Sequence, residues 1–114
     1  MSTPREAPLY THCHDLVLAL TQIEPTPTLR PVLERAWALL DAIAVALSLP
    51  GERPSALAEA DRRVAQLKVG LRVVEAAGGL SEGRARVLGE SLVDIGRMIG
   101  GWRRRERSQK TQTE

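Results

Sequence analysis

Apolar residues recur every three or four positions in four separate segments, a spacing that places them on one side of an α-helix. We therefore predict helices over residues 8–23, 28–49, 55–77 and 82–104. The apolar residues are mostly Leu, Ala and Val, and only three residues are aromatic, which favours helix over sheet. The pattern predicts an all-α protein.

Helix-breaking residues separate these segments. Two prolines lie between residues 24 and 28, and two more flank the stretch 50–54, where a continuous helix is excluded. Gly78 and Gly79 predict the end of the third helix. Thr28, Ser55 and Ser81 are the expected N-caps of the last three helices.

Each predicted helix has one apolar series that we expect to be buried. In the second helix the series is Leu33, Trp37, Leu40, Ala44 and Leu47. In the first helix the series is Tyr10, Cys13, Leu16, Val17 and Leu20. In the third helix it is Leu57, Ala60, Val64, Leu67, Leu71 and Val74, and in the fourth it is Leu88, Leu92, Ile95, Ile99 and Trp102. Four such helices with short connections predict an antiparallel up-down-up-down four-helix bundle over residues 8–107. Residues 1–7 are expected to form a flexible tail, and residues 108–114 a disordered one.

Three glycines lie beside the apolar stripe of the last helix. Gly89, Gly96 and Gly100 fall about 80–120° from its centre, at 100° per residue. Each costs on the order of 0.5–1 kcal/mol relative to Ala inside a helix. Close approach of another helix would offset this cost, either within the bundle or, together with Trp102, at a subunit interface.

Basic residues gather near the C-terminus, although the net charge is only +2. Arg86, Arg97 and Arg104 fall on the side of the last helix opposite the apolar stripe, and Arg103 and Arg105 flank them. Two interpretations stay open. The arginines form a solvated helix face, or they bind phosphate or an acidic partner.

The sequence offers no catalytic centre, metal site or cofactor site. His12 and His14 lie about 200° apart on a helix, so both cannot face one ion. Cys13 has no base positioned beside it. We expect a protein that is not an enzyme and binds no cofactor. No apolar run reaches the roughly 18 residues needed to cross a membrane, and the N-terminus lacks a secretion signal. We therefore expect a cytoplasmic protein.

The stretch from Asp94 to Trp102, with sequence DIGRMIGGW, resembles the end of the accessory variability determinant (Avd) family of diversity-generating retroelements. Related four-helix-bundle proteins, encoded by intervening sequences in ribosomal RNA genes, have a similar ending. The segments CHDLVL at 13–18 and LKVGLR at 67–72 also resemble family positions, although His14 stands where Tyr is usual.

This resemblance implies a homopentamer of four-helix bundles with a basic surface. It implies binding to the reverse transcriptase of the same element and to nucleic acid, as template RNA or cDNA, in support of mutagenic cDNA synthesis. Lys68, Arg72 and Arg97 match basic positions of the family. Two alternatives remain open: a protein-only adaptor that docks on the polymerase without touching nucleic acid, and a standalone bundle of the ribosomal-intervening-sequence type.

Overall fold

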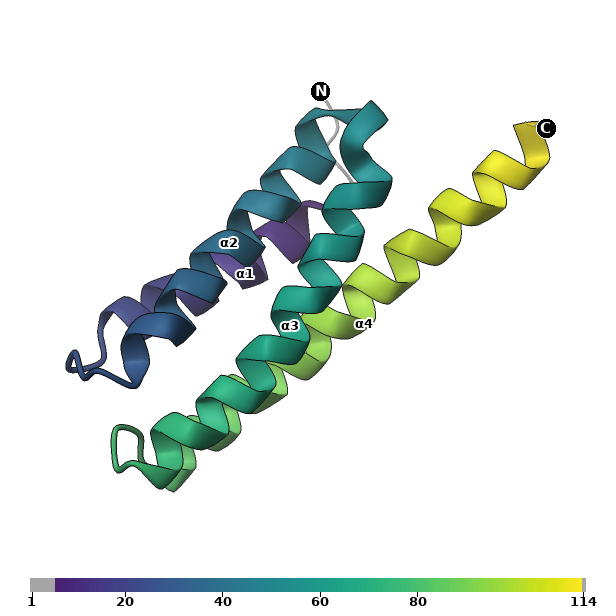
Figure 1. The fold of residues 1–114 in the computed structure, drawn as a ribbon. Coiled ribbons are helices and arrows are strands. Elements are labelled where there is room, and N and C mark those ends of the chain that lie inside the picture. Colours follow the sequence, from purple (N-terminus) through teal and green to yellow (C-terminus); the bar gives the residue numbers. More distant parts are fainter. Residues whose placement is uncertain (1–5, 114) are drawn as a thin grey trace.

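The computed structural model describes the backbone of residues 6–113 and the side chains of residues 6–109. Within this range the chain folds into four packed helices with no strands. They are α1 (Ala7–Thr21), α2 (Leu29–Ser48), α3 (Arg53–Ala76) and α4 (Glu82–Thr113), and a short 3₁₀ turn η1 (Pro50–Glu52) leads into α3. The α1–α2 and α3–α4 connections lie at one end of the molecule, and the α2–α3 connection lies at the other (Figure 1). The predicted helical bundle is confirmed.

The helix ends follow local chemistry. Gly78 has a backbone φ of +82°, a conformation that residues other than Gly rarely adopt. The Gly79 amide donates to the Val74 carbonyl at 2.9 Å and the Gly78 amide donates to the Glu75 carbonyl at 3.0 Å, the paired bonds that end a helix at such a glycine. At the start of α4 the Arg84 amide donates to Ser81 Oγ at 3.1 Å, so the predicted cap at Ser81 is confirmed.

The other two predicted caps do not form. Thr28 precedes α2 but makes no side-chain bond to a helix amide. Ser55 lies inside α3, where its hydroxyl donates to the Glu52 carbonyl at 3.0 Å. The reason is η1, which supplies a preformed turn and lets α3 begin two residues before Ser55, at Arg53.

The predicted core is confirmed in α3 and α4, where every member of both apolar series is buried. In α1 the prediction is right except at Tyr10, which is 38% exposed, while Leu9 takes the buried position. Cys13, Leu16, Val17 and Leu20 are all buried as expected.

The predicted buried face of α2 is wrong by one residue. Most of its core positions are Val32, Ala36, Leu39, Ile43 and Ala46, each one position before a predicted member. Trp37 is 49% exposed, and of the predicted series only Leu40 is buried. The physical reason is close packing between α2 and α3. A Cβ added at Gly70 of α3 would lie 2.8 Å from Val32 Cγ2, so the missing side chain of Gly70 leaves room for Val32 of α2 to point inward. With Val32 and Leu39 on the inner side, Trp37 falls on the outer side of α2.

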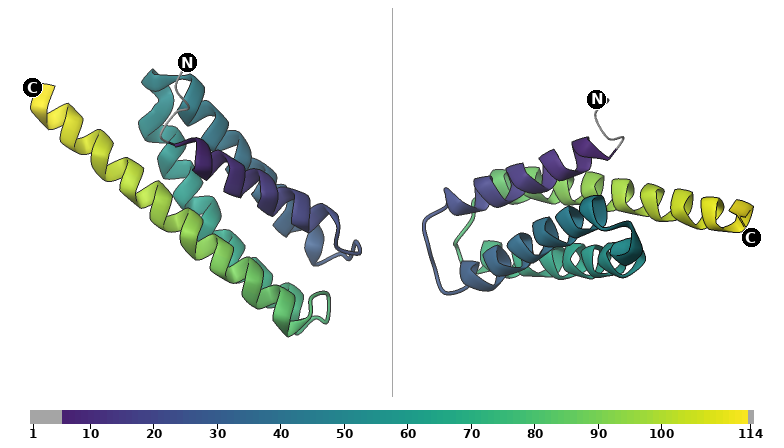
Figure 2. Two further views of the ribbon diagram at one scale, coloured as in Figure 1. Left: turned by 180° about the vertical axis from the view of Figure 1, so that it is seen from behind. Right: turned by 90° about the horizontal axis from the view of Figure 1, so that it is seen from above.

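The last helix is longer than predicted. It continues past Arg104 to Thr113 and projects beyond the end of the other three helices (Figure 2). The predicted disordered tail is therefore helical from residue 108 to residue 113. At the other terminus α1 already begins at Ala7, and residues 1–5 of the predicted N-terminal tail lie outside the described residues.

Candidate partner-binding face on helices α3 and α4

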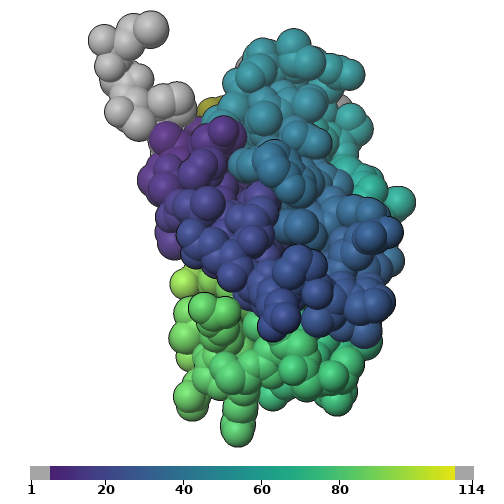
Figure 3. Space-filling model, turned by 90° about the vertical axis from the view of Figure 1, so that its left-hand side faces the viewer, coloured from purple at the N-terminus to yellow at the C-terminus, as the bar shows by residue number. Residues whose placement is uncertain are grey.

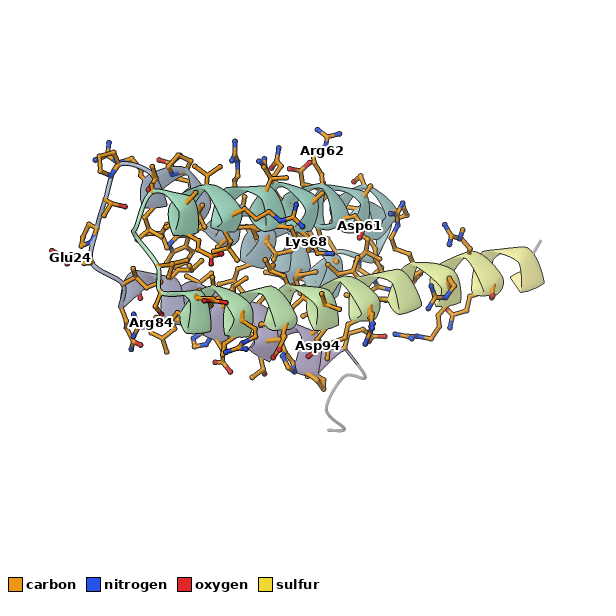
Figure 4. All side chains as sticks on the ribbon, turned by 90° about the horizontal axis from the view of Figure 1, so that it is seen from below. Glu24, Asp61, Arg62, Lys68, Arg84 and Asp94 are labelled. Carbon is orange, nitrogen blue, oxygen red and sulfur yellow. The ribbon has the colours of Figure 1, made fainter. Side chains whose placement is uncertain are left out.

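One ion pair and one short distance show which sides of α3 and α4 face each other. Arg103 of α4 forms an ion pair with Asp61 of α3. A Cβ added at Gly96 would lie 3.7 Å from Val64 Cγ1. Asp61 and Lys68 are seven residues apart, so both lie on the side of α3 that faces α4, as Figure 4 shows. Arg72 follows one turn later on α3.

Five basic side chains are exposed on the face that α3 and α4 form together. Lys68 and Arg72 come from α3. Arg86, Arg97 and Arg104 come from α4, where spacings of 11 and 7 residues align them along its outer side. No ion pair joins any of these five to an acidic residue within the described part of the chain. We call this set the basic face.

Two predicted binding residues do not belong to the basic face. Arg103 is half-buried and bonds to Asp61. Arg105 Nη2 lies 3.3 Å from Glu6 Oε1, just before α1. Their guanidinium charges are neutralised by acids of the same chain, so they join α4 to α3 and to the start of α1. These acids lie 42 and 99 residues away in sequence, and binding of a partner by Arg103 and Arg105 stays a prediction.

Trp102 belongs to a cluster that closes this end of the bundle. Its side chain is 2% exposed, and Nε1 donates to Glu106 Oε1 at 3.1 Å. Arg53 lies over the ring, with its guanidinium carbon 5.3 Å from the centroid. Arg53 Nη1 also donates to Glu106 Oε1 at 3.1 Å, and Arg53 Nε donates to the Ala46 carbonyl at 2.7 Å. Trp102 therefore packs within the subunit. Its partner Arg53 was not predicted, because the two residues lie on different helices and meet only in the folded chain.

A hollow of about 550 Å³ adjoins this cluster. Its charged lining balances, because Glu6 pairs with Arg105 and Arg53 pairs with Glu106. Its other lining residues are Ala7, Tyr10, Thr11, Leu47, Trp102 and Gln109. A lining without net charge gives an anion no electrostatic advantage here, in contrast to the basic face.

The glycines of α4 are not needed for close packing inside the subunit. A Cβ added at Gly89 would meet nothing within 4 Å, and at Gly100 it would meet only the Arg104 side chain at 3.5 Å. The contact at Gly96 is an ordinary van der Waals distance. Gly70 is the opposite case, because Val32 leaves no room for a Cβ. Of the two explanations for the glycines in α4, close approach within the bundle is not what the structure shows.

The remaining candidate residues form no reactive centre. Cys13 is fully buried, and loss of hydration raises the pKa of its thiol to about 12, which disfavours the reactive thiolate. His14 Nδ1 lies 3.3 Å from Asp15 Oδ1 at the surface. Over the described residues, no three His, Cys, Asp or Glu side chains gather where they could hold a metal ion.

A search for membrane spans and the comparisons with known proteins complete this description. None of the described helices combines the length and apolar character that a membrane span requires. Scans of the chain against protein-family models, curated proteins and solved structures each find no match. The resemblance of residues 94–102 to the Avd ending therefore stays a prediction.

Proposed function

We propose that this chain is a non-enzymatic accessory subunit of a diversity-generating retroelement, which binds the element's reverse transcriptase and its RNA or cDNA through the basic face. The observation that supports the proposal is the alignment of Lys68, Arg72, Arg86, Arg97 and Arg104 on two adjacent helices, all exposed. A row of cations without acidic partners attracts a polyanion, and each phosphate that it neutralises releases a counterion.

We also propose an antiparallel up-down-up-down order of helices and assembly as a homopentamer, which would repeat the basic face around a ring.

The first test is the salt dependence of binding to a fluorescent DNA duplex, measured by anisotropy. If five phosphates are engaged, a plot of the logarithm of the DNA-binding constant against the logarithm of the salt concentration should have a slope of about −4.5. The double variant Arg72→Glu with Arg97→Glu should weaken binding by at least about tenfold. A matched control is Arg30→Glu with Arg84→Glu, which makes the same change in charge at two exposed arginines away from the basic face.

The second test asks whether a reverse transcriptase gene lies next to the gene of this chain and whether its product co-purifies with the chain. The mass of the assembly in solution is measured as well. Polymerase binding without DNA or RNA binding would identify a protein-only adaptor. Binding to neither would leave a standalone bundle and contradict the proposal. Equal losses in the Arg72/Arg97 and Arg30/Arg84 variants would show that only net charge matters, and not the basic face.

A further inference from the structure

The ion pair between Asp61 and Arg103 lies on the same side of α3 as Lys68. Asp61 comes seven residues before Lys68, about two helical turns, and both residues lie on the side of α3 that faces α4 (Figure 4). Arg103 reaches this line of residues from α4. Its positive charge therefore lies beside the basic face, although Asp61 neutralises it there.

A competing anion can reach this ion pair from solvent. The side chains of Arg103 and Asp61 keep 34% and 39% of their surface exposed. Water and salt screen an ion pair this open, and such pairs contribute little to stability. A guanidinium group has five N–H donors, and within the described residues Arg103 makes one hydrogen bond, from Nη1 to Asp61 Oδ2. Donors therefore remain for a phosphate.

The packing of α4 against the bundle does not depend on this pair. Leu92, Ile95 and Ile99 of α4 are fully buried, as is Leu67 of α3. This apolar core stays buried when Arg103 turns to another partner. The ion pair is therefore not the main support of α4, and exchange of one acid for another would leave the helices in place.

The pair between Arg105 and Glu6 differs in position. Arg105 lies two residues after Arg103, about 200° around the helix, and its acid comes just before α1. Arg105 thus lies on the side of α4 toward α1, away from Lys68. This second pair offers a control for the first, because it has the same chemistry on another side of the molecule.

We infer that Arg103 is a further phosphate-binding residue and that Asp61 withholds it from nucleic acid. Carboxylate and phosphate oxygens accept the same guanidinium hydrogen bonds, so the two compete for one cation. While Asp61 holds Arg103, binding relies on the five cations of the basic face. Without the Asp61 charge, a sixth cation joins them. The inference rests on the proposed function, because it needs a nucleic acid on the basic face.

The test measures the salt dependence of duplex DNA binding, by anisotropy, for variants that each remove one negative charge. Asp61→Asn also releases Arg103. Glu90→Gln removes a charge from the exposed side of α4 and releases no cation, because no ion pair engages Glu90 within the described residues. Glu6→Gln releases Arg105 on the other side of α4.

We expect Asp61→Asn to make the salt slope more negative by about 0.9, the contribution of one more phosphate, and to tighten binding at least about threefold. Glu90→Gln and Glu6→Gln should keep the slope of the parent chain. Adding Arg103→Gln to Asp61→Asn should return the slope to the parent value. Arg103→Gln alone should leave the slope unchanged, because Asp61 already withholds that arginine. Circular dichroism should show equal helix content in all variants.

Four results would overturn the inference while DNA binding by the parent chain stands. They are an unchanged slope for Asp61→Asn, an equal change in either control, a gain that persists after Arg103 is replaced, and a smaller slope for Arg103→Gln alone. Absence of DNA binding in both the parent chain and Asp61→Asn would instead contradict the proposed function together with the inference.

Discussion

The guanidinium carbon of Arg53 lies 5.3 Å from the centre of the Trp102 ring, and Glu106 accepts a hydrogen bond from both residues. Arg53 begins α3 and the other two residues lie on α4, so the contact joins helices far apart in sequence. It also satisfies the indole N–H of a core tryptophan, which would be costly to bury alone.

Removing the centre of this cluster should destabilise the fold. We expect Arg53→Ala to lower the free energy of unfolding by about 1–3 kcal/mol, because the Trp102 ring loses its cation and Glu106 loses a donor. Urea denaturation followed by circular dichroism measures the change. Arg62→Ala, at an exposed site on the same helix, is the control and should stay within about 0.5 kcal/mol of the parent. Equal stability of the two variants would contradict the role given to Arg53.

Two glycines should respond in opposite directions to the same substitution. Gly70→Ala places a Cβ 2.8 Å from Val32 Cγ2 and should cost about 1–3 kcal/mol. Gly89→Ala meets nothing and should stabilise the subunit by about 0.5–1 kcal/mol through better helix propensity. Thermal unfolding of both variants tests the pair. A destabilised Gly89→Ala would mean that the space beside Gly89 is filled in the assembled protein.

The orientation of α2 can be tested by substitution at neighbouring positions. Leu39 is fully buried, so Leu39→Ala should cost about 2–5 kcal/mol. Trp37 is 49% exposed, and Trp37→Ala should cost clearly less despite the larger volume removed. The midpoints of urea unfolding decide between the two faces. If Trp37→Ala proved the more damaging change, the helix would be turned as the sequence first suggested.

Burial of Cys13 should make stability fall in alkaline solution. Its pKa is raised from 9.0 to about 12, so the folded state keeps the thiol proton at a pH where the unfolded state has lost it. The stabilisation is complete below pH 9 and is lost as the pH rises toward 12, with a slope of up to about 1.4 kcal/mol per pH unit. Cys13→Ala should reduce the slope of unfolding free energy against pH above pH 9 relative to the parent chain.

The same burial predicts an unreactive thiol. At pH 8 a thiol reagent should leave the folded protein unmodified and should react with one equivalent after denaturation. Rapid labelling of the folded chain would show that α1 opens readily.

The sequence predicts best where one apolar stripe dominates a helix. All the expected core positions of α3 and α4 are buried, because each helix has a single stripe and polar residues cover much of the rest of its surface. The segment that forms α2 carries Leu, Ala, Ile and Val on several sides, so periodicity allows two neighbouring faces. The choice between them depends on contacts with other helices, such as the one between Val32 and Gly70 of α3, which no pattern within α2 can reveal.

The basic face was predictable in part. The exposure of Arg86, Arg97 and Arg104 followed from helical phase on α4 alone. The loss of Arg103 and Arg105 to ion pairs did not, because Asp61 and Glu6 approach them only after the chain has folded.

Because α2 buries a different face from the predicted one and leaves Trp37 exposed, the molecule has two unlike sides. Leu47, on the same stripe as Trp37, lines a hollow with Tyr10 and Thr11, so this stripe lies along the edge that α2 shares with α1. Figure 3 shows α1 and α2 next to each other on that side, while the cations lie on α3 and α4. A label attached beside Trp37 would therefore leave Lys68 and Arg97 uncovered, so the two sides of the subunit can be probed independently.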